Sequence, residues 1–218
     1  MKTCLIVTGG TMDLEFAGSF LKNKTFDFVV AVDGGLEYLK PLGILPNAVV
    51  GDFDTVNQEV FLEYHKFEEV TWEIHRPEKD ETDTELAIET AISMGAESIT
   101  ILGGTGGRID HLLANIHLLA GCLERGISAC MVDRQNKLYL LDRETTFRQN
   151  DLHGKYLSFL PLTEEVRGIT LTGFKYPLTK KNISIGREAG LCVSNELVAE
   201  SGTIAFDSGC LVCVESRD

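Results

Sequence analysis

Short apolar runs alternate with amphipathic segments along the first part of the chain. Continuous or alternating apolar runs, which are typical of strands, occupy residues 2–8, 28–32, 48–50, 70–75, 98–102 and 127–133. Between them, apolar residues recur with helical spacing over residues 14–21, 36–41, 82–94 and 109–123. This succession predicts an α/β fold with a mostly parallel, doubly wound sheet that carries helices on both faces.

Two of the predicted helices have recognisable ends. Thr82 and Glu85 have the spacing of a capping box, so a helix is expected to begin at Asp83. Residues 109–123 match the amphipathic helical pattern along their whole length, and Gly126 stands where a glycine commonly ends a helix.

After Arg134 no segment has an amphipathic pattern of helical length. Short apolar runs separated by turn residues predict strands near residues 138–141, 156–160, 169–171, 191–194, 203–206 and 211–215. We therefore expect two domains, a Rossmann-like α/β domain over residues 1–134 and a smaller all-β sandwich or half-barrel over residues 135–218. A β-domain of this size is small for independent stability, so the first domain or a second subunit is expected to cover one face.

The charge of the chain restricts its partners. Its 218 residues carry a formal net charge of -13, which argues against binding to nucleic acid or to an anionic membrane surface. An anionic substrate would have to be met by a metal ion and by backbone N–H groups. The six cysteines lie mostly within apolar runs, and no apolar run reaches the length of a membrane span, so a reducing, cytoplasmic location is expected.

Acidic residues are concentrated after the third predicted strand and before the helix at residue 83. Asp52 and Asp54 lie in the segment Gly51-Asp52-Phe53-Asp54, and Asp80 and Asp83 lie in Asp80-Glu81-Thr82-Asp83. In an extended segment Asp52 and Asp54 would point the same way, and clustered carboxylates need a counter-ion. Carboxylate oxygens suit Mg²⁺, which usually arrives with a phosphate substrate. The alternative is that each aspartate only caps a helix or starts a turn.

Glycines follow the strands that are expected to end at the same edge of the sheet. They lie in Gly9-Gly10, in Asp33-Gly34-Gly35 and in the glycine loop, Gly103-Gly104-Thr105-Gly106-Gly107. Glycines there let the backbone approach a phosphate chain, and Arg108 next to the loop could hold phosphate oxygens, although turn geometry and a surface charge are the simpler explanations. Neither the Walker pattern nor the dinucleotide fingerprint is present. Asp110 and His111 begin the following helix, where either could be structural.

In chain order, these motifs resemble the successive signatures of the thiamine pyrophosphokinase (thiamine diphosphokinase) family. The segment Ser194-Asn195-Glu196 looks like that family's thiamine-side motif. The resemblance implies an α/β domain that holds ATP and Mg²⁺, a C-terminal β-domain that binds thiamine, and a homodimer with active sites at the subunit interface. It also implies the reaction, in which a pyrophosphoryl group passes from ATP to the thiamine hydroxyl and AMP is released.

The resemblance assigns a role to each candidate residue. Asp52, Asp54 and Asp83 match the metal-associated aspartates. Arg108 and Asp110 match residues near the reacting groups, and Asp110 is also expected near the substrate. Ser194 and Asn195 match residues that face the thiamine pyrimidine. The nucleotide side comprises Gly10, Asp33, Gly34, Gly35, Gly103, Gly104, Thr105, Gly106, Gly107 and Arg108.

The sequence leaves open which aromatic residue contacts thiamine and which phosphate-dependent activity the chain has. The lone Trp72 falls on a strand of the first domain, so Phe174 or Tyr176 is the expected aromatic neighbour of thiamine, unless both only pack in the core. The same aspartates and glycine loop would also suit another Mg²⁺-dependent phosphotransferase or phosphohydrolase, or a nucleotide or thiamine sensor without catalytic activity.

Overall fold

The computed structural model describes residues 1–22, 24–54, 56–76 and 80–218. The chain divides into two compact units, Met1–Arg134 and Gln135–Asp218. The first unit is α/β and the second consists of antiparallel strands, so the fold class predicted from the sequence is confirmed.

The first unit is built on a parallel sheet whose strand order is β4-β3-β2-β1-β5-β6. The chain moves outward from β1 to β4 and then returns to place β5 on the other side of β1. Such a reversal leaves a crevice at the carboxyl ends of the strands, which is where doubly wound proteins bind their ligands. The strands are β1 (Thr3–Val7), β2 (Phe28–Val32), β3 (Ala48–Gly51), β4 (Thr71–Ile74), β5 (Ser98–Leu102) and β6 (Ser128–Val132).

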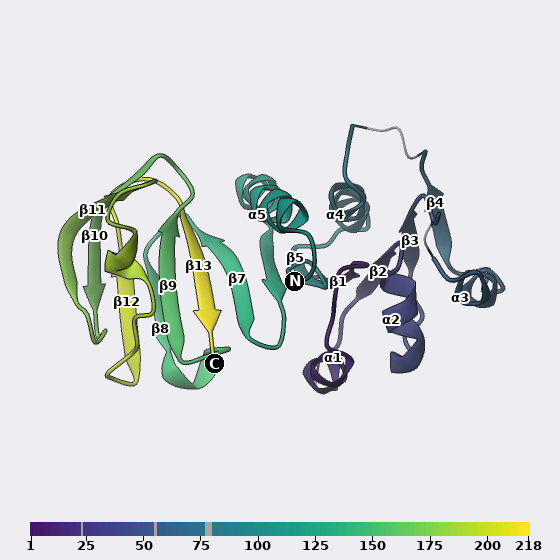
Figure 1. The fold of residues 1–218 in the computed structure, drawn as a ribbon, viewed down its shortest axis with the longest axis horizontal. Helices are drawn as coiled ribbons and strands as arrows, with labels where there is room; N and C mark the ends of the chain where they lie inside the picture. The colour runs from purple at the N-terminus through teal and green to yellow at the C-terminus, as the bar shows by residue number, and fades with distance from the viewer. Residues whose placement is uncertain (23, 55, 77–79) are drawn as a thin grey trace. The chain divides into compact units, whose positions relative to one another are not determined.

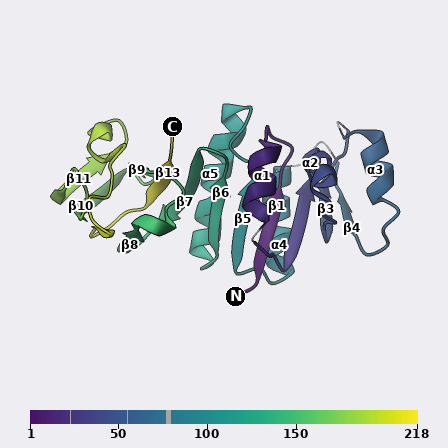
Figure 2. The same ribbon diagram turned by 90° about the horizontal axis from the view of Figure 1, so that it is seen from below.

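Five helices cover this sheet. Helices α1, α2 and α3 lie on one face and α4 and α5 lie on the other (Figures 1 and 2). The central strands β1, β2 and β3 are almost entirely apolar because both of their faces are covered. The helices are α1 (Leu14–Leu21), α2 (Gly35–Leu42), α3 (Gln58–Tyr64), α4 (Asp83–Ser93) and α5 (Ile109–Glu124).

Helix caps explain where several of these elements begin. Thr82 caps α4 by accepting a hydrogen bond from the Glu85 N–H at 3.2 Å, which confirms that this helix begins at Asp83. The sequence pattern did not predict α3, a helix of only seven residues. Asn57 caps it by accepting hydrogen bonds from the N–H groups of Glu59 and Val60.

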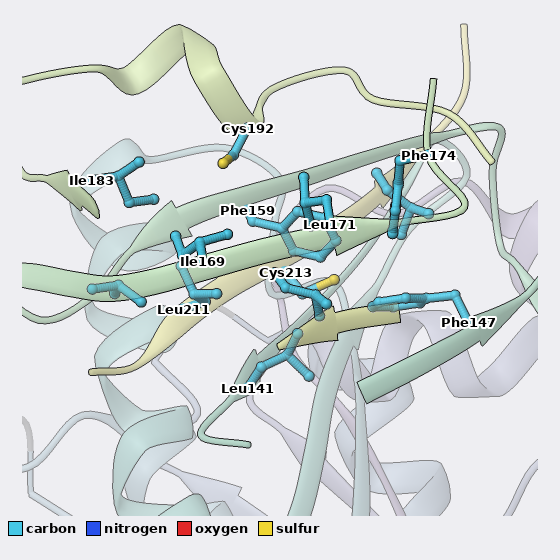
Figure 3. Close-up of a cluster of buried hydrophobic side chains, with 13 residues drawn as sticks. Leu141, Phe147, Phe159, Ile169, Leu171, Phe174, Ile183, Cys192, Leu211 and Cys213 are labelled. Carbon is cyan, nitrogen blue, oxygen red and sulfur yellow. The ribbon is translucent and has the colours of Figure 1, made fainter. Parts of the chain in front are cut away.

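The second unit contains two antiparallel sheets, with strand orders β7-β13-β9 and β11-β10-β12-β8. Side chains from both sheets form one buried cluster, which includes Phe147, Phe159 and Phe174 (Figure 3). The strands are β7 (Asn136–Leu141), β8 (Thr145–Arg148), β9 (Tyr156–Pro161), β10 (Glu165–Thr172), β11 (Leu178–Ser184), β12 (Ser201–Ala205) and β13 (Leu211–Ser216).

Three details of this unit differ from the sequence prediction. The prediction of a strand at residues 191–194 is wrong. The chain instead forms a short 3₁₀ helix, η2 (Ala189–Cys192), which buries Cys192 and leaves Leu191 exposed. Strands β8 and β11 were not predicted, since both lie at the edges of their sheet and are largely polar. A second 3₁₀ turn, η1, spans Gln149–Asp151.

None of the six cysteines, all of which lie within the described residues, forms a disulfide bond. Within the described part of the chain, no helix combines the length and apolar character needed to cross a bilayer.

Candidate active site

A cleft of about 530 Å³ opens at the carboxyl edge of the parallel sheet in the first unit. The segments after β1, β2 and β5 line it, together with the first turns of α4 and α5. Nine of the residues predicted for the nucleotide or metal side line this cleft, namely Gly10, Asp33, Gly34, Asp83, Gly103, Gly104, Gly106, Gly107 and Arg108.

The glycines in this cleft are required by the close approach of two loops. A Cβ atom at Gly10 would lie 2.2 Å from the carbonyl oxygen of Gly103 and 2.8 Å from that of Gly106. A Cβ atom at Gly106 would in turn lie 2.3 Å from the carbonyl oxygen of Thr11. Any side chain at these positions would push the loops apart, so the glycines allow the loops after β1 and β5 to form one continuous backbone wall.

A buried asparagine supports this wall from α5. Asn115 is 6% exposed and donates a hydrogen bond from Nδ2 to the carbonyl oxygen of Gly104 at 3.0 Å. The bond fixes the direction of that peptide group beside the cleft. Asn115 was not among the predicted site residues, although a polar residue inside an otherwise apolar helix face was the available signal.

Asp33 is an acidic residue of this cleft whose pKa is strongly shifted. Burial, reinforced by the negative charges of Asp83 and Asp52, raises the pKa of the Asp33 carboxyl to about 6. Its Oδ1 also accepts hydrogen bonds from the N–H groups of Asp52 at 3.1 Å and Phe53 at 3.2 Å. The carboxylates of Asp52, after β3, and of Asp83, at the start of α4, are therefore close enough to repel that of Asp33.

Asp52 and Asp54 are held differently from the expected extended arrangement. Strand β3 ends at Gly51, and Phe53 has a left-handed backbone with a φ of 60°. The Asp54 N–H donates to Asp52 Oδ1 at 3.2 Å, so the segment is a turn, and the expected strand-like alternation of the two side chains is wrong. Asp52 is half-buried and Asp54 is exposed.

The carboxylates in and beside this cleft suit a metal ion that is bound together with a substrate. Among the residues that the structure describes, no group of three or more His, Cys, Asp or Glu side chains is spaced to hold a metal by itself. Mg²⁺ usually binds to one or two carboxylates and completes its shell with water and substrate phosphates. The hard oxygen donors of Asp52 and Asp83 fit a cation that arrives with a phosphate chain, and so does Asp33, whose pKa is raised first by burial and then by the charges of Asp83 and Asp52.

Arg108 and Asp110 pair with each other at the start of α5. The Arg108 guanidinium donates two hydrogen bonds to the Asp110 carboxylate, one of them from Nε at 3.1 Å. This pairing lowers the pKa of Asp110 and raises that of Arg108, and both side chains are more than half exposed. Arg108 lines the cleft and could exchange this exposed carboxylate for a phosphate group.

The remaining predicted residues of the first unit lie beside the cleft. Gly35, Thr105, Asp52, Asp54 and Asp110 do not line it. Gly35 packs against β1, because a Cβ atom there would lie 2.0 Å from the Val7 carbonyl oxygen.

Ser194 and Asn195 lie in the second unit, in the loop after η2. Asn195 is 1% exposed, and its side chain accepts from the Tyr176 N–H at 3.0 Å and donates to the Tyr176 carbonyl at 2.9 Å. Ser194 is exposed, has a left-handed backbone, and donates its N–H to Ser158 Oγ at 2.9 Å. Asn195 therefore fastens the Ser194 loop to the segment that carries Tyr176.

The two aromatic candidates for thiamine differ in exposure. Phe174 is 3% exposed, and its ring centroid lies 5.9 Å from that of Phe159, so it belongs to the core. Tyr176 is 55% exposed and remains available to a ligand. Trp72 contacts Phe53 and Phe61 in the first unit.

The fold and the cleft define the class of protein. A doubly wound sheet that carries closely packed glycine loops and carboxylates at its carboxyl edge is typical of an enzyme that acts on a phosphate chain. Two family models match the chain, the thiamin pyrophosphokinase catalytic domain over residues 20–131 and the thiamin pyrophosphokinase vitamin B1 binding domain over residues 144–211. The thiamine pyrophosphokinase of Bacillus subtilis is 36% identical to the chain over 222 residues, and the match covers 100% of both proteins.

Solved structures agree with this match. The crystal structure of the Bacillus subtilis thiamine pyrophosphokinase superposes with a TM-score of 0.86 at 33% identity and full coverage of both chains. That of the Geobacillus thermodenitrificans thiamin pyrophosphokinase superposes with a TM-score of 0.85 at 36% identity, covering 99% of this chain and 98% of the other. The chain belongs to the thiamin pyrophosphokinase family, whose members transfer a pyrophosphoryl group from ATP to thiamine.

Proposed function

We propose that this chain transfers the pyrophosphoryl group of ATP to the hydroxyl of thiamine, with Mg²⁺ bound jointly by the Asp52, Asp54 and Asp83 carboxylates, the phosphates of ATP and water. The proposal rests on the cleft that is lined both by the glycine-loop backbone and by two carboxylates, Asp33 and Asp83. Backbone glycines accommodate a phosphate chain, and carboxylates accommodate the cation that accompanies it.

The reaction requires attack by the thiamine hydroxyl at the β-phosphorus of ATP. Reactions of this type depend mainly on positioning and on neutralising phosphate charge. Mg²⁺ bound by the aspartates would neutralise the phosphate oxygens and make the β-phosphorus more electrophilic. Arg108 supplies a second positive charge once it leaves Asp110 for the phosphates. The net charge of -13 makes such neutralisation necessary for ATP and favours the approach of cationic thiamine.

Thiamine is assigned to the loop of the second unit that Asn195 fastens in place. Ser194 offers an exposed hydroxyl there, and Tyr176 offers an exposed ring on which the pyrimidine could stack. Because the side-chain polar atoms of Asn195 bond to Tyr176, we assign it the role of holding Ser194 and Tyr176 together.

The active enzyme is proposed to be a homodimer. Ile109 and Leu113 lie one turn apart on α5 and are 72% and 53% exposed. In the second unit Val193 and Val198 flank the Ser194 loop and are 42% and 67% exposed. Apolar side chains of this size exposed beside both candidate sites are consistent with a second copy that covers them.

Product analysis tests the reaction. Incubation with Mg²⁺, ATP and thiamine should yield AMP and thiamine pyrophosphate in equal amounts, whereas ADP as the main nucleotide product would indicate a different phosphotransferase. The variant Asp54→Asn should lose turnover by about 100-fold or more, with Asp151→Asn as the matched control at an exposed site of the second unit. A protein that binds thiamine but shows no turnover in any form would be a sensor.

A further inference from the structure

Phe53 is distinguished by its position in the chain and by its backbone conformation. It lies between Asp52 and Asp54, and its backbone is left-handed with a φ of 60°. This conformation is disfavoured for a residue with a bulky side chain and persists only where the surroundings enforce it. Such strain is concentrated at ligand-binding and catalytic sites.

The Phe53 ring is part of an aromatic cluster. Its centroid lies 5.3 Å from the ring of Trp72 on β4 and 5.6 Å from the ring of Phe61 on α3. Phe61 and Trp72 are 4.9 Å apart, and the His65 ring stacks on Phe61 at 5.2 Å. Helix α3 and strand β4 lie next to each other in both ribbon views (Figures 1 and 2). The cluster therefore ties the Phe53 ring to two neighbouring elements.

The backbone of the same residue is held from the other direction. The Phe53 N–H donates to Asp33 Oδ1, which also accepts from the Asp52 N–H. The ring contacts and the amide contacts together fix the turn that carries Asp52 and Asp54.

Building on the proposed function, we propose that Phe53 is a positioning residue for the metal site. Its ring anchors the strained turn, and this anchoring places the two flanking carboxylates before any cation arrives. Phe53 itself contributes no ligand atom. The contacts also couple the site to Trp72, the only tryptophan in the chain, so metal binding should be visible in tryptophan emission.

Substitutions at Phe53 separate the anchoring ring from the backbone strain. Glycine adopts a φ near 60° without strain but has no ring, whereas tyrosine retains the ring. Phe53→Gly and Phe53→Ala should therefore both raise the Mg²⁺ concentration for half-maximal turnover by about 10-fold or more, the range typical of residues that orient metal ligands. Phe53→Tyr should keep the wild-type value.

The same titration is read from Trp72 emission, with Mg²⁺ alone and with Mg²⁺ plus ATP. Phe16→Ala serves as the matched control, because Phe16 is a half-buried aromatic residue on α1 that pairs with Phe20. It should lower stability to urea without moving the Mg²⁺ midpoint. Should Phe53→Ala and Phe53→Gly fail to fold, Phe53→Leu makes the same comparison with more apolar volume retained.

The results distinguish this inference from the function on which it rests. A wild-type enzyme that needs no Mg²⁺ overturns the proposed metal site and this inference with it. A metal-dependent wild type whose Phe53→Gly variant keeps the same Mg²⁺ midpoint overturns this inference alone. A raised midpoint in the glycine and alanine variants, with an unchanged midpoint in Phe53→Tyr and Phe16→Ala, supports it.

Discussion

Replacing Asp33 with asparagine should make the protein more stable at neutral pH. Burial and the charges of Asp83 and Asp52 raise the pKa of Asp33 from 3.8 to about 6. The folded state therefore binds the carboxyl proton of Asp33 more tightly than the unfolded chain does. As a result, the free energy of unfolding decreases as the pH rises from 3.8 to about 6. The difference of about 2 pKa units corresponds to about 3 kcal/mol at most.

The asparagine removes this penalty while keeping the local hydrogen bonds. Its amide oxygen can still accept the N–H bonds of Asp52 and Phe53, which now go to Asp33 Oδ1. We expect Asp33→Asn to raise the free energy of unfolding by up to about 3 kcal/mol near pH 7, and to show a much smaller difference near pH 4, where Asp33 is largely protonated in the folded wild type. Turnover should fall, as is common when a destabilised site residue is relaxed.

Urea unfolding of both proteins at the two pH values measures this effect. Asp142→Asn is the control of opposite sign, because hydrogen bonds from Arg143 lower the pKa of Asp142 and its removal should bring no stabilisation. An Asp33→Asn variant that is no more stable than wild type near pH 7, or equally stabilised at both pH values, would refute the reasoning.

Two further substitutions test the glycine-loop wall. Gly10→Ala places a Cβ atom 2.2 Å from the Gly103 carbonyl oxygen, so the affinity for ATP, measured by calorimetry, should fall by about 10-fold or more. Gly121→Ala is the control, because a Cβ atom at this position in α5 meets no atom within 4 Å, and it should leave the affinity for ATP unchanged. Asn115→Asp replaces the donor to the Gly104 carbonyl with an acceptor, and we expect a raised KM for ATP with a smaller change in kcat. An unchanged KM would show that the loop holds its conformation without this bond.

Much of the first unit could be predicted from the sequence because its patterns are strong. Buried strands covered on both faces read as continuous apolar runs, and the Thr82 cap marks the start of α4 to the residue. Asp33 and the loop from Gly103 to Arg108 follow strand ends and meet in one cleft, as expected for a doubly wound sheet, and Asp83 joins them from the start of α4.

The features that the sequence did not reveal depend on tertiary contacts. The turn at Asp52 and Asp54 follows from the left-handed backbone of Phe53, which its ring contacts stabilise and no local pattern encodes. Asn115 acquires its role only when α5 packs beside Gly104. In the second unit, the edge strands β8 and β11 carry too few apolar residues to stand out from loops.

The most direct test of the proposed reaction follows the β-phosphorus of ATP. When ATP labelled at that atom is incubated with the enzyme, Mg²⁺ and thiamine, pyrophosphoryl transfer predicts that all transferred label leaves the nucleotide. The label should appear in thiamine pyrophosphate, at the phosphorus bonded to the thiamine oxygen, and AMP should carry none. Label that remains in ADP, or that is released as free phosphate, would contradict the account.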